Sequence, residues 1–287
     1  MIKKTTYALA LILAALALGA CGKKQEAQPT AQPAAAVQIP KVVPGEMVLI
    51  PAGEYTIGTN EPSPENKKEK TNAYPEHKVK LPAFWIGKYE VTGKEYLDFS
   101  LKTGYVPEGE SEGKTWRTFF STGKAYNPVT YITWKDADAF CKGMGMRLPT
   151  EDEWEAAARG PNGSRYPWGN DWDTSKTNTA EAGFHIPVDV GKFDQDVSPF
   201  GVHDMFGNVQ EWTSNMYKPY KGNPNAGAQE YNAGYRVIRG LSSRYSGAKV
   251  LGLWVRTFSP PSYLADFGCR CAKDATPEEA AKAAPVK

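Results

Sequence analysis

The chain has 287 residues, of which 41% are hydrophobic and 23% are charged, and its formal net charge is +2. This length and composition are typical of one globular domain large enough to bury its own core. Two of the 34 basic residues, Lys3 and Lys4, precede an apolar leader, so the remaining 32 balance the 32 acidic residues. That balance argues against a nucleic-acid-binding or anionic-lipid-binding surface, which would need a clustered basic excess.

The first 20 residues have the pattern of a secretory leader. The apolar run over residues 9–18 is shorter than the roughly 20 residues that a membrane-spanning helix needs. It ends in Leu18-Gly19-Ala20-Cys21, which resembles the lipobox of bacterial lipoproteins. We therefore expect cleavage before Cys21 and lipidation of that cysteine, and the alternative is a plain signal peptide followed by a structural cysteine. Gly22 follows in place of the Asp that favours the inner membrane, so we expect an outer-membrane lipoprotein that faces the periplasm or the cell surface.

The composition divides the rest of the chain into three parts. Residues 21–44 begin at the lipidated cysteine and continue as a Gln-, Ala- and Pro-rich stretch, which predicts a flexible tether. Residues 45–273 form the domain. The tail, residues 274–287, is predicted to be frayed or to form a short exposed helix.

Within the domain, strands are predicted over 47–58, 79–91 and 235–240, and helices over 92–103, 135–144 and 150–159. Two of the helices start with a capping box, in which side chains bond the free backbone N–H groups of the first turn. These boxes are Thr92 with Glu95 and Thr150 with Glu153. Short elements and long loops predict an irregular α+β fold, in which a disulfide, bound ions or buried Trp must hold the loops.

The cysteines other than Cys21 are Cys141, Cys269 and Cys271. An odd number in an oxidising compartment indicates one disulfide and one free thiol, and leaves the pairing open.

The domain contains, in order, motifs that resemble those of the formylglycine-generating enzyme (sulfatase-modifying factor) family. The resemblance covers essentially the whole domain and implies a loop-rich C-type-lectin-like fold, often with bound calcium. The motifs include Met47-Val48-Leu49-Ile50-Pro51-Ala52-Gly53, Tyr89-Glu90-Val91-Thr92, Arg147-Leu148-Pro149-Thr150-Glu151, Tyr166-Pro167-Trp168-Gly169, Gly207-Asn208-Val209 with Glu211-Trp212, and Gly268-Cys269-Arg270-Cys271.

The resemblance also implies what is missing. In the oxidase members, two cysteines that follow an Arg-Gly-Gly-Ser motif bind copper and oxidise a substrate cysteine. The resemblance places these two positions at about Tyr245 and Val250, and no cysteine lies anywhere between Gly240 and Gly268. Because copper(I) needs soft thiolate ligands, we expect no copper and no formylglycine synthesis.

A related branch of the superfamily binds iron through three histidines. The three histidines here, His77, His185 and His203, are widely separated and lack metal-ligand spacing. Iron chemistry would therefore require the fold to gather them.

Further site residues follow from the same resemblance. It pairs Cys141 with Cys271 and leaves Cys269 as a buried thiol. It implies structural calcium at Glu211 with the carbonyls of Phe206, Gly207 and Val209, although a buried capping carboxylate is the alternative for Glu211. A second calcium site would use Asn178, Thr179 and a Phe184 carbonyl, but Ala182, beside Glu181, replaces the usual Asp.

The segment over 241–267 forms the catalytic groove in the oxidases. Here it carries Arg244, Tyr245, Trp254, Arg256, Tyr263 and Asp266. Aromatic and Arg side chains favour a binding surface, and ordinary loop packing is the alternative. We therefore interpret the chain as a non-catalytic binding or assembly module of the cell envelope, whose partner is an envelope protein or surface ligand. The alternative is a metal-dependent oxidoreductase of the same superfamily that uses non-cysteine ligands.

Overall fold

The computed structural model describes residues 42–63, 71–108, 113–118, 120, 123–225, 227, 229–250, 252–262 and 267–283. All of them belong to one compact unit, Ile39–Lys287. Cys21, most of the expected tether, Tyr263 and Asp266 lie outside the described residues. Within the described ranges, no helix is long and apolar enough to cross a membrane.

Four antiparallel strands begin the domain: β1 (Met47–Ile50), β2 (Gly53–Ile57), β3 (His77–Leu81) and β4 (Phe84–Gly87). β1 pairs with β4, and β2 pairs with β3 in a separate sheet. The single strand predicted over 47–58 is thus two strands, β1 and β2. The single strand predicted over 79–91 corresponds to β3 and β4, and this prediction extends past the end of β4 at Gly87. Pro51 and Pro82 lie at the breaks, because proline has no backbone N–H to donate to a ladder.

The three long helices are α1 (Gly93–Thr103), α2 (Trp134–Gly143) and α3 (Glu151–Arg159). Each starts after a threonine cap that forms a complete capping box, so the predicted helices are confirmed. The cap of α2 is Thr133 with Asp136, which the predicted start at residue 135 missed. In the tail, α4 (Pro277–Ala280) is a short helix without buried residues.

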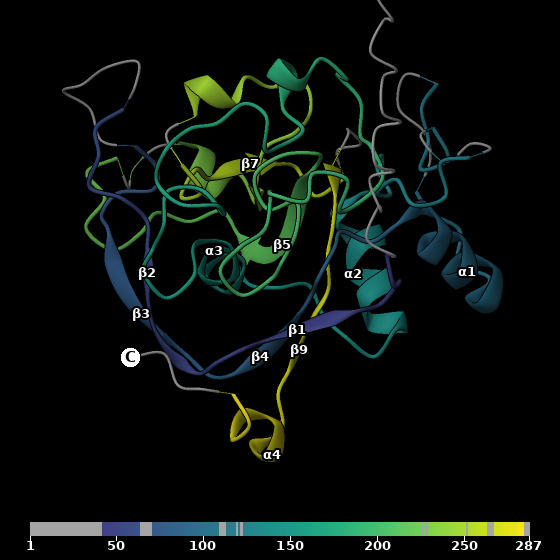
Figure 1. Ribbon diagram of the computed structural model, residues 1–287, viewed down its shortest axis with the longest axis horizontal. Helices are drawn as coiled ribbons and strands as arrows, with labels where there is room; N and C mark the ends of the chain where they lie inside the picture. Colours follow the sequence, from purple (N-terminus) through teal and green to yellow (C-terminus); the bar gives the residue numbers. More distant parts are fainter. Residues whose placement is uncertain are drawn as a thin grey trace, which may run out of the picture. The chain divides into compact units, whose positions relative to one another are not determined.

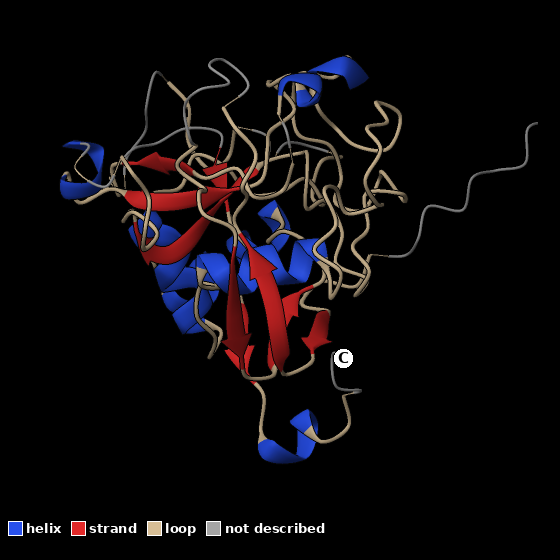
Figure 2. Ribbon diagram, turned by 90° about the vertical axis from the view of Figure 1, so that its left-hand side faces the viewer, coloured by secondary structure: helices blue, strands red, loops and turns tan. Residues whose placement is uncertain are grey.

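The remaining strands come from segments far apart in the chain. β5 (Gln210–Met216), β6 (Arg236–Arg239), β7 (Thr257–Ser259) and β8 (Phe267–Gly268) form a sheet in the order β7-β6-β5-β8, with β5 and β8 parallel. β9 (Ala272–Asp274) joins β4, which gives the order β1-β4-β9. Single-turn 3₁₀ helices η1 (Ala180–Ala182), η2 (Gln229–Asn232) and η3 (Gly247–Lys249) lie in the loops. Figure 2 shows how much chain runs in loops between these short elements.

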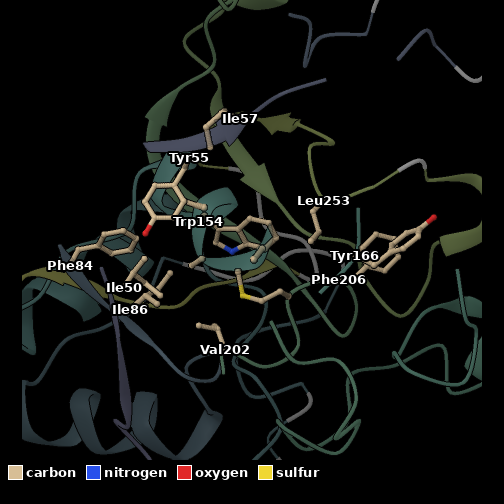
Figure 3. Packing of buried hydrophobic residues seen from close by; sticks show 14 of the residues in the cluster. Ile50, Tyr55, Ile57, Phe84, Ile86, Trp154, Tyr166, Val202, Phe206 and Leu253 are labelled. Atoms are coloured by element: carbon tan, nitrogen blue, oxygen red, sulfur yellow. The ribbon is translucent and has the colours of Figure 1, made fainter. Parts of the chain in front are cut away.

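Helix α3 is the centre of the larger core. It contacts β2, β5 and β6, and Figure 1 shows it between β2 and β5. Trp154 of α3 is fully buried, and Figure 3 shows its indole among side chains from β1, β2, β4 and the loops. The core is therefore built around one helix whose position is fixed on several sides.

A disulfide joins α2 to the segment that leads into β9. Cys141 and Cys271 are bonded with their Cα atoms 5.5 Å apart, which is the pairing that the family resemblance implied. Cys269 is a buried free thiol. The bridge closes a loop of 130 residues and lies in the second buried cluster, which α1 and α2 help to form.

Candidate functional site

The segment between β6 and Val250 contains the two positions that the family resemblance leads us to compare with the copper-binding cysteines of the oxidases, Tyr245 and Val250. Tyr245 has 52% of its surface exposed, and Val250 is half-buried. Gly247 lies so close to Trp172 that a Cβ there would come within 2.2 Å of the indole. The segment thus rests on Trp172 through its backbone and exposes the phenol of Tyr245.

Glu181 holds this segment in place. Its carboxylate accepts hydrogen bonds from the Ser246 hydroxyl at 2.5 Å and from the amides of Gly247 and Ala248 at 3.1 and 3.2 Å. Burial opposes the charged form, but the hydrogen bonds from Ser246, Thr179 and Ala248 outweigh it and lower the pKa of Glu181 to about 2. The carboxylate beside Ala182 therefore fixes the loop that carries Tyr245.

The expected groove residues do not share one exposed surface. Arg244 and Tyr245 are exposed, but Arg256 is 3% exposed and Trp254 is 5% exposed. Arg256 donates from Nε and Nη2 to the two carboxylate oxygens of Glu151, at 2.7 and 2.9 Å. Its role is to tie the loop before β7 to α3, which corrects the expectation of a groove anchor. Tyr263 and Asp266 lie outside the described residues.

The structure also gives Glu211 a partner other than calcium. Arg270 donates from Nε and Nη2 to the two oxygens of Glu211 at 2.7 Å each, and Trp154 Nε1 donates to one of them at 2.9 Å. All three side chains are fully buried. The positive charge beside this carboxylate is therefore a guanidinium, which fits the alternative of a buried structural carboxylate.

The turn before Glu211 is tightly packed. Phe206, Gly207 and Val209 are buried, and a Cβ on Gly207 would lie 2.2 Å from Thr177 Oγ1. Only glycine fits this close approach of two chain segments. The turn thus joins β5 to the loop that carries Asn178.

Asn178 retains one feature of the second expected calcium site. Its Nδ2 donates to Asn208 Oδ1 at 3.0 Å, whereas its Oδ1 is buried without a hydrogen-bond partner among the described residues. An orphaned amide oxygen fits a calcium ligand. Thr179 instead donates its hydroxyl to Glu181, and Phe184 is 43% exposed. Across the described ranges, no three His, Cys, Asp or Glu side chains gather as a metal site.

Three buried acidic residues near this turn were not among the site residues predicted from the sequence. Glu90, Asp196 and Asp204 are buried, and burial raises the pKa of Asp196 to about 7 and that of Asp204 to about 6. Burial and the neighbouring Asp204 also raise the pKa of Glu90 well above its usual value. Glu90 stands in the Tyr-Glu-Val-Thr motif, but the two aspartates lie in a loop that shows no pattern. These carboxyls are held partly in the neutral form within the fold.

The histidines have separate surroundings. His77 contacts the Pro75 carbonyl and the Tyr220 ring, and His203 packs on Tyr89. Burial lowers the pKa of His203 to about 4, so this imidazole is neutral at pH 7. No contact among the described residues joins these two histidines to His185 as a metal triad.

The sequence is similar to one domain family and to proteins of known name. A family model described as "Sulfatase-modifying factor enzyme 1-like domain" matches residues 32–275. "Inactive C-alpha-formylglycine-generating enzyme 2" of Mus musculus is 30% identical over 283 residues, covering 80% of this chain and 86% of that protein. "Formylglycine-generating enzyme" of Bos taurus is 28% identical over 336 residues, covering 91% and 87%.

Among solved structures, PvdO from Pseudomonas aeruginosa has a similar fold. It superposes with a TM-score of 0.65 at 25% identity, over 80% of this chain and 94% of that one. Since the family model covers most of the sequence and the fold agrees with it, the chain belongs to the family of sulfatase-modifying factor enzyme 1-like domains.

Proposed function

We propose that this chain is an envelope protein whose domain binds a partner and does not make formylglycine. The observation that carries this proposal is the absence of usable thiols. The sequence has no cysteine between Gly240 and Gly268. Cys141 and Cys271 are bonded to each other, and burial raises the pKa of the Cys269 thiol well above its usual value. Copper(I) chemistry requires thiolates, and this domain offers none in the matching segment.

Two further observations favour binding. The mouse relative is itself named as an inactive member of the family. At the position of the first missing cysteine, the chain exposes Tyr245, next to the exposed Arg244. Tyr and Arg are enriched among the side chains that dominate protein interfaces. We propose that this pair contacts an envelope protein.

The proposal includes the anchor and an ion. A lipid on Cys21 would hold the domain to the membrane, with residues 22–44 as the tether and the outer membrane as the location. A calcium ion at Asn178 would act on stability and not on chemistry, since calcium binds hard oxygen ligands without a redox role.

Cross-linking in intact cells tests the binding role. The full-length chain should form a specific cross-linked product that Tyr245→Ala removes, because losing an interface hot spot costs about 2 kcal/mol or more. Tyr126→Ala is the matched control, since Tyr126 is an exposed tyrosine elsewhere, at 42% exposure. A product retained by Tyr245→Ala would refute this face as the contact. Stoichiometric copper or iron in the purified chain would instead support the oxidoreductase alternative.

A further inference from the structure

An apolar groove lies where the chain enters the domain. Its lining comes from the segment that leads into β1, the segment between β4 and α1, and the end of α2 with the turn that follows. The apolar side chains of the first and last of these are Val42, Val43, Met47, Phe140, Met144 and Met146. Neither Arg244 nor Tyr245 lines this N-terminal groove, so it is separate from the surface proposed above to contact a protein.

The side chains of the N-terminal groove leave apolar surface open to water. Val43 is 49% exposed and Met144 is 50% exposed, with the half-buried Met47 and Met146 in the same lining. Apolar surface of this kind is stabilised when another apolar group covers it. Methionine side chains are flexible and adapt to the group that packs on them. The groove is therefore suited to receive an aliphatic side chain.

Size and charge argue against a larger or a polar ligand. The cavity measures about 50 Å³, far below the roughly 300–1,000 Å³ of small-molecule sites. Two carboxylates of the lining already have partners. Glu46 pairs with Lys88 at 2.9 Å, and Glu95 accepts from the amide and the hydroxyl of Thr92 at 2.7 Å each. A single aliphatic side chain fits this space and this polarity best.

The chain itself supplies such a side chain beside the groove. Ile39 precedes Val42 by three residues, which span at most about 11 Å. Within 22–41, Val37 and Ile39 are the only Val, Leu, Ile, Met or aromatic residues, and Ile39 is the nearer to the groove. Pro40 follows it, and the fixed φ of proline lowers the entropy that the segment loses on packing.

Two further observations connect this segment with the domain. The compact unit that contains the domain starts at Ile39, and the family model starts at residue 32. Both starts precede residue 45, where composition alone predicted the end of the tether. The residues just before Val42 therefore belong with the domain.

We propose that Ile39 packs into the N-terminal groove against Val43 and Met144. The occupant is this chain's own segment over 39–41, and the free part of the tether is then residues 22–38. The contact fixes the point at which the tether leaves the domain, close to the end of α2. It does not depend on partner binding at Tyr245.

A double-mutant cycle in thermal melts of the full-length chain tests the contact. Ile39→Ala should lower the Tm by about 2–4 °C, because it removes apolar surface that the groove buries. Met144→Ala with Ile39→Ala should lower the Tm by less than the two single shifts together, since both variants remove the same contact. Val106→Ala is the control, because Val106 is an aliphatic side chain with 82% exposure, and it should melt like the wild type.

Cross-linking gives a second readout that does not depend on stability. Ile39→Cys combined with Met144→Cys should form an intramolecular product with a short bismaleimide. Ile39→Cys combined with Met216→Cys is the matched control, because Met216 is similarly exposed, at 46%, and does not line the groove. The native thiol of Cys269 is buried and the other two cysteines of the domain are bonded, so the wild type should give no such product.

Three results would overturn the contact. One is a set of Tm shifts that add up without coupling, or no shift for Ile39→Ala. Another is equal cross-linking of Ile39→Cys to Met144→Cys and to Met216→Cys. The third is a product that joins two chains in place of one, which would make a second copy the occupant of the groove.

Discussion

Replacing Glu211 by Gln should destabilise the domain by about 3–5 kcal/mol, because it leaves a buried guanidinium without its counter-charge. Arg270 and Glu211 are both fully buried, and two hydrogen bonds of 2.7 Å join them. Arg270 also donates to the carbonyls of Gly87 and His203, at 3.0 Å each, so the variant cannot simply expel it. For a domain of this size the loss corresponds to a fall of about 6–20 °C in Tm.

The assay is thermal and urea unfolding of the full-length chain, with and without a calcium chelator. Glu46→Gln is the control, since it removes a half-exposed partner of Lys88 and should cost about 1 kcal/mol or less. The cost of Glu211→Gln should be the same with and without chelator, because its partner is an arginine. A cost below about 1 kcal/mol, or one that disappears on chelation, would refute the assigned role of the pair.

Burial raises the pKa of Asp196 to about 7, so the folded state holds a proton that the unfolded state releases near pH 4. The free energy of unfolding should therefore fall as pH rises from about 4 to about 7, and Asp196→Asn should flatten this slope in thermal melts. If Asn178 Oδ1 binds calcium, chelation should lower the Tm of the wild type and not that of Asn178→Ala; equal melts of the wild type with and without chelator would count against the site. Non-reduced peptide mapping should link Cys141 to Cys271 and leave Cys269 free, and replacing the bonded pair by alanine should cost up to about 5 kcal/mol for a loop of 130 residues. Cys21→Ser should move the chain out of the membrane fraction, and an unchanged distribution would contradict the lipid anchor.

Local signals predicted the helices well. The boxes that start at Thr92 and Thr150 need only residues three positions apart, so the sequence contains the whole interaction. The strands were harder, because their pairing is non-local. β5 is not among the strands predicted from the sequence, yet it is a strand because β6 and β8 flank it. Pro51 and Pro82 mark the breaks between β1 and β2 and between β3 and β4, but the sequence runs around these prolines were interpreted as continuous strands.

In the candidate site, too, the features set by local motifs were predictable and those set by distant contacts were not. The positions of Tyr245 and Val250 followed from the family motifs, because these fix the alignment around Gly240. The partner of Arg256 lies 105 residues away, and that of Arg270 lies 59 residues away. No periodicity or spacing in one sequence reports such distant pairs, so a buried structural arginine was interpreted as a binding anchor.

Mass spectrometry of a cysteine peptide tests the central claim most directly. The full-length chain, purified in detergent, would be incubated with copper(I), oxygen and a sulfatase-type peptide, alongside copper-loaded bovine formylglycine-generating enzyme as the positive control. We expect an unmodified cysteine at every time point, since no thiol pair stands at Tyr245 and Val250 to hold the metal. Aldehyde product that accumulates with time above the enzyme-free background would contradict it.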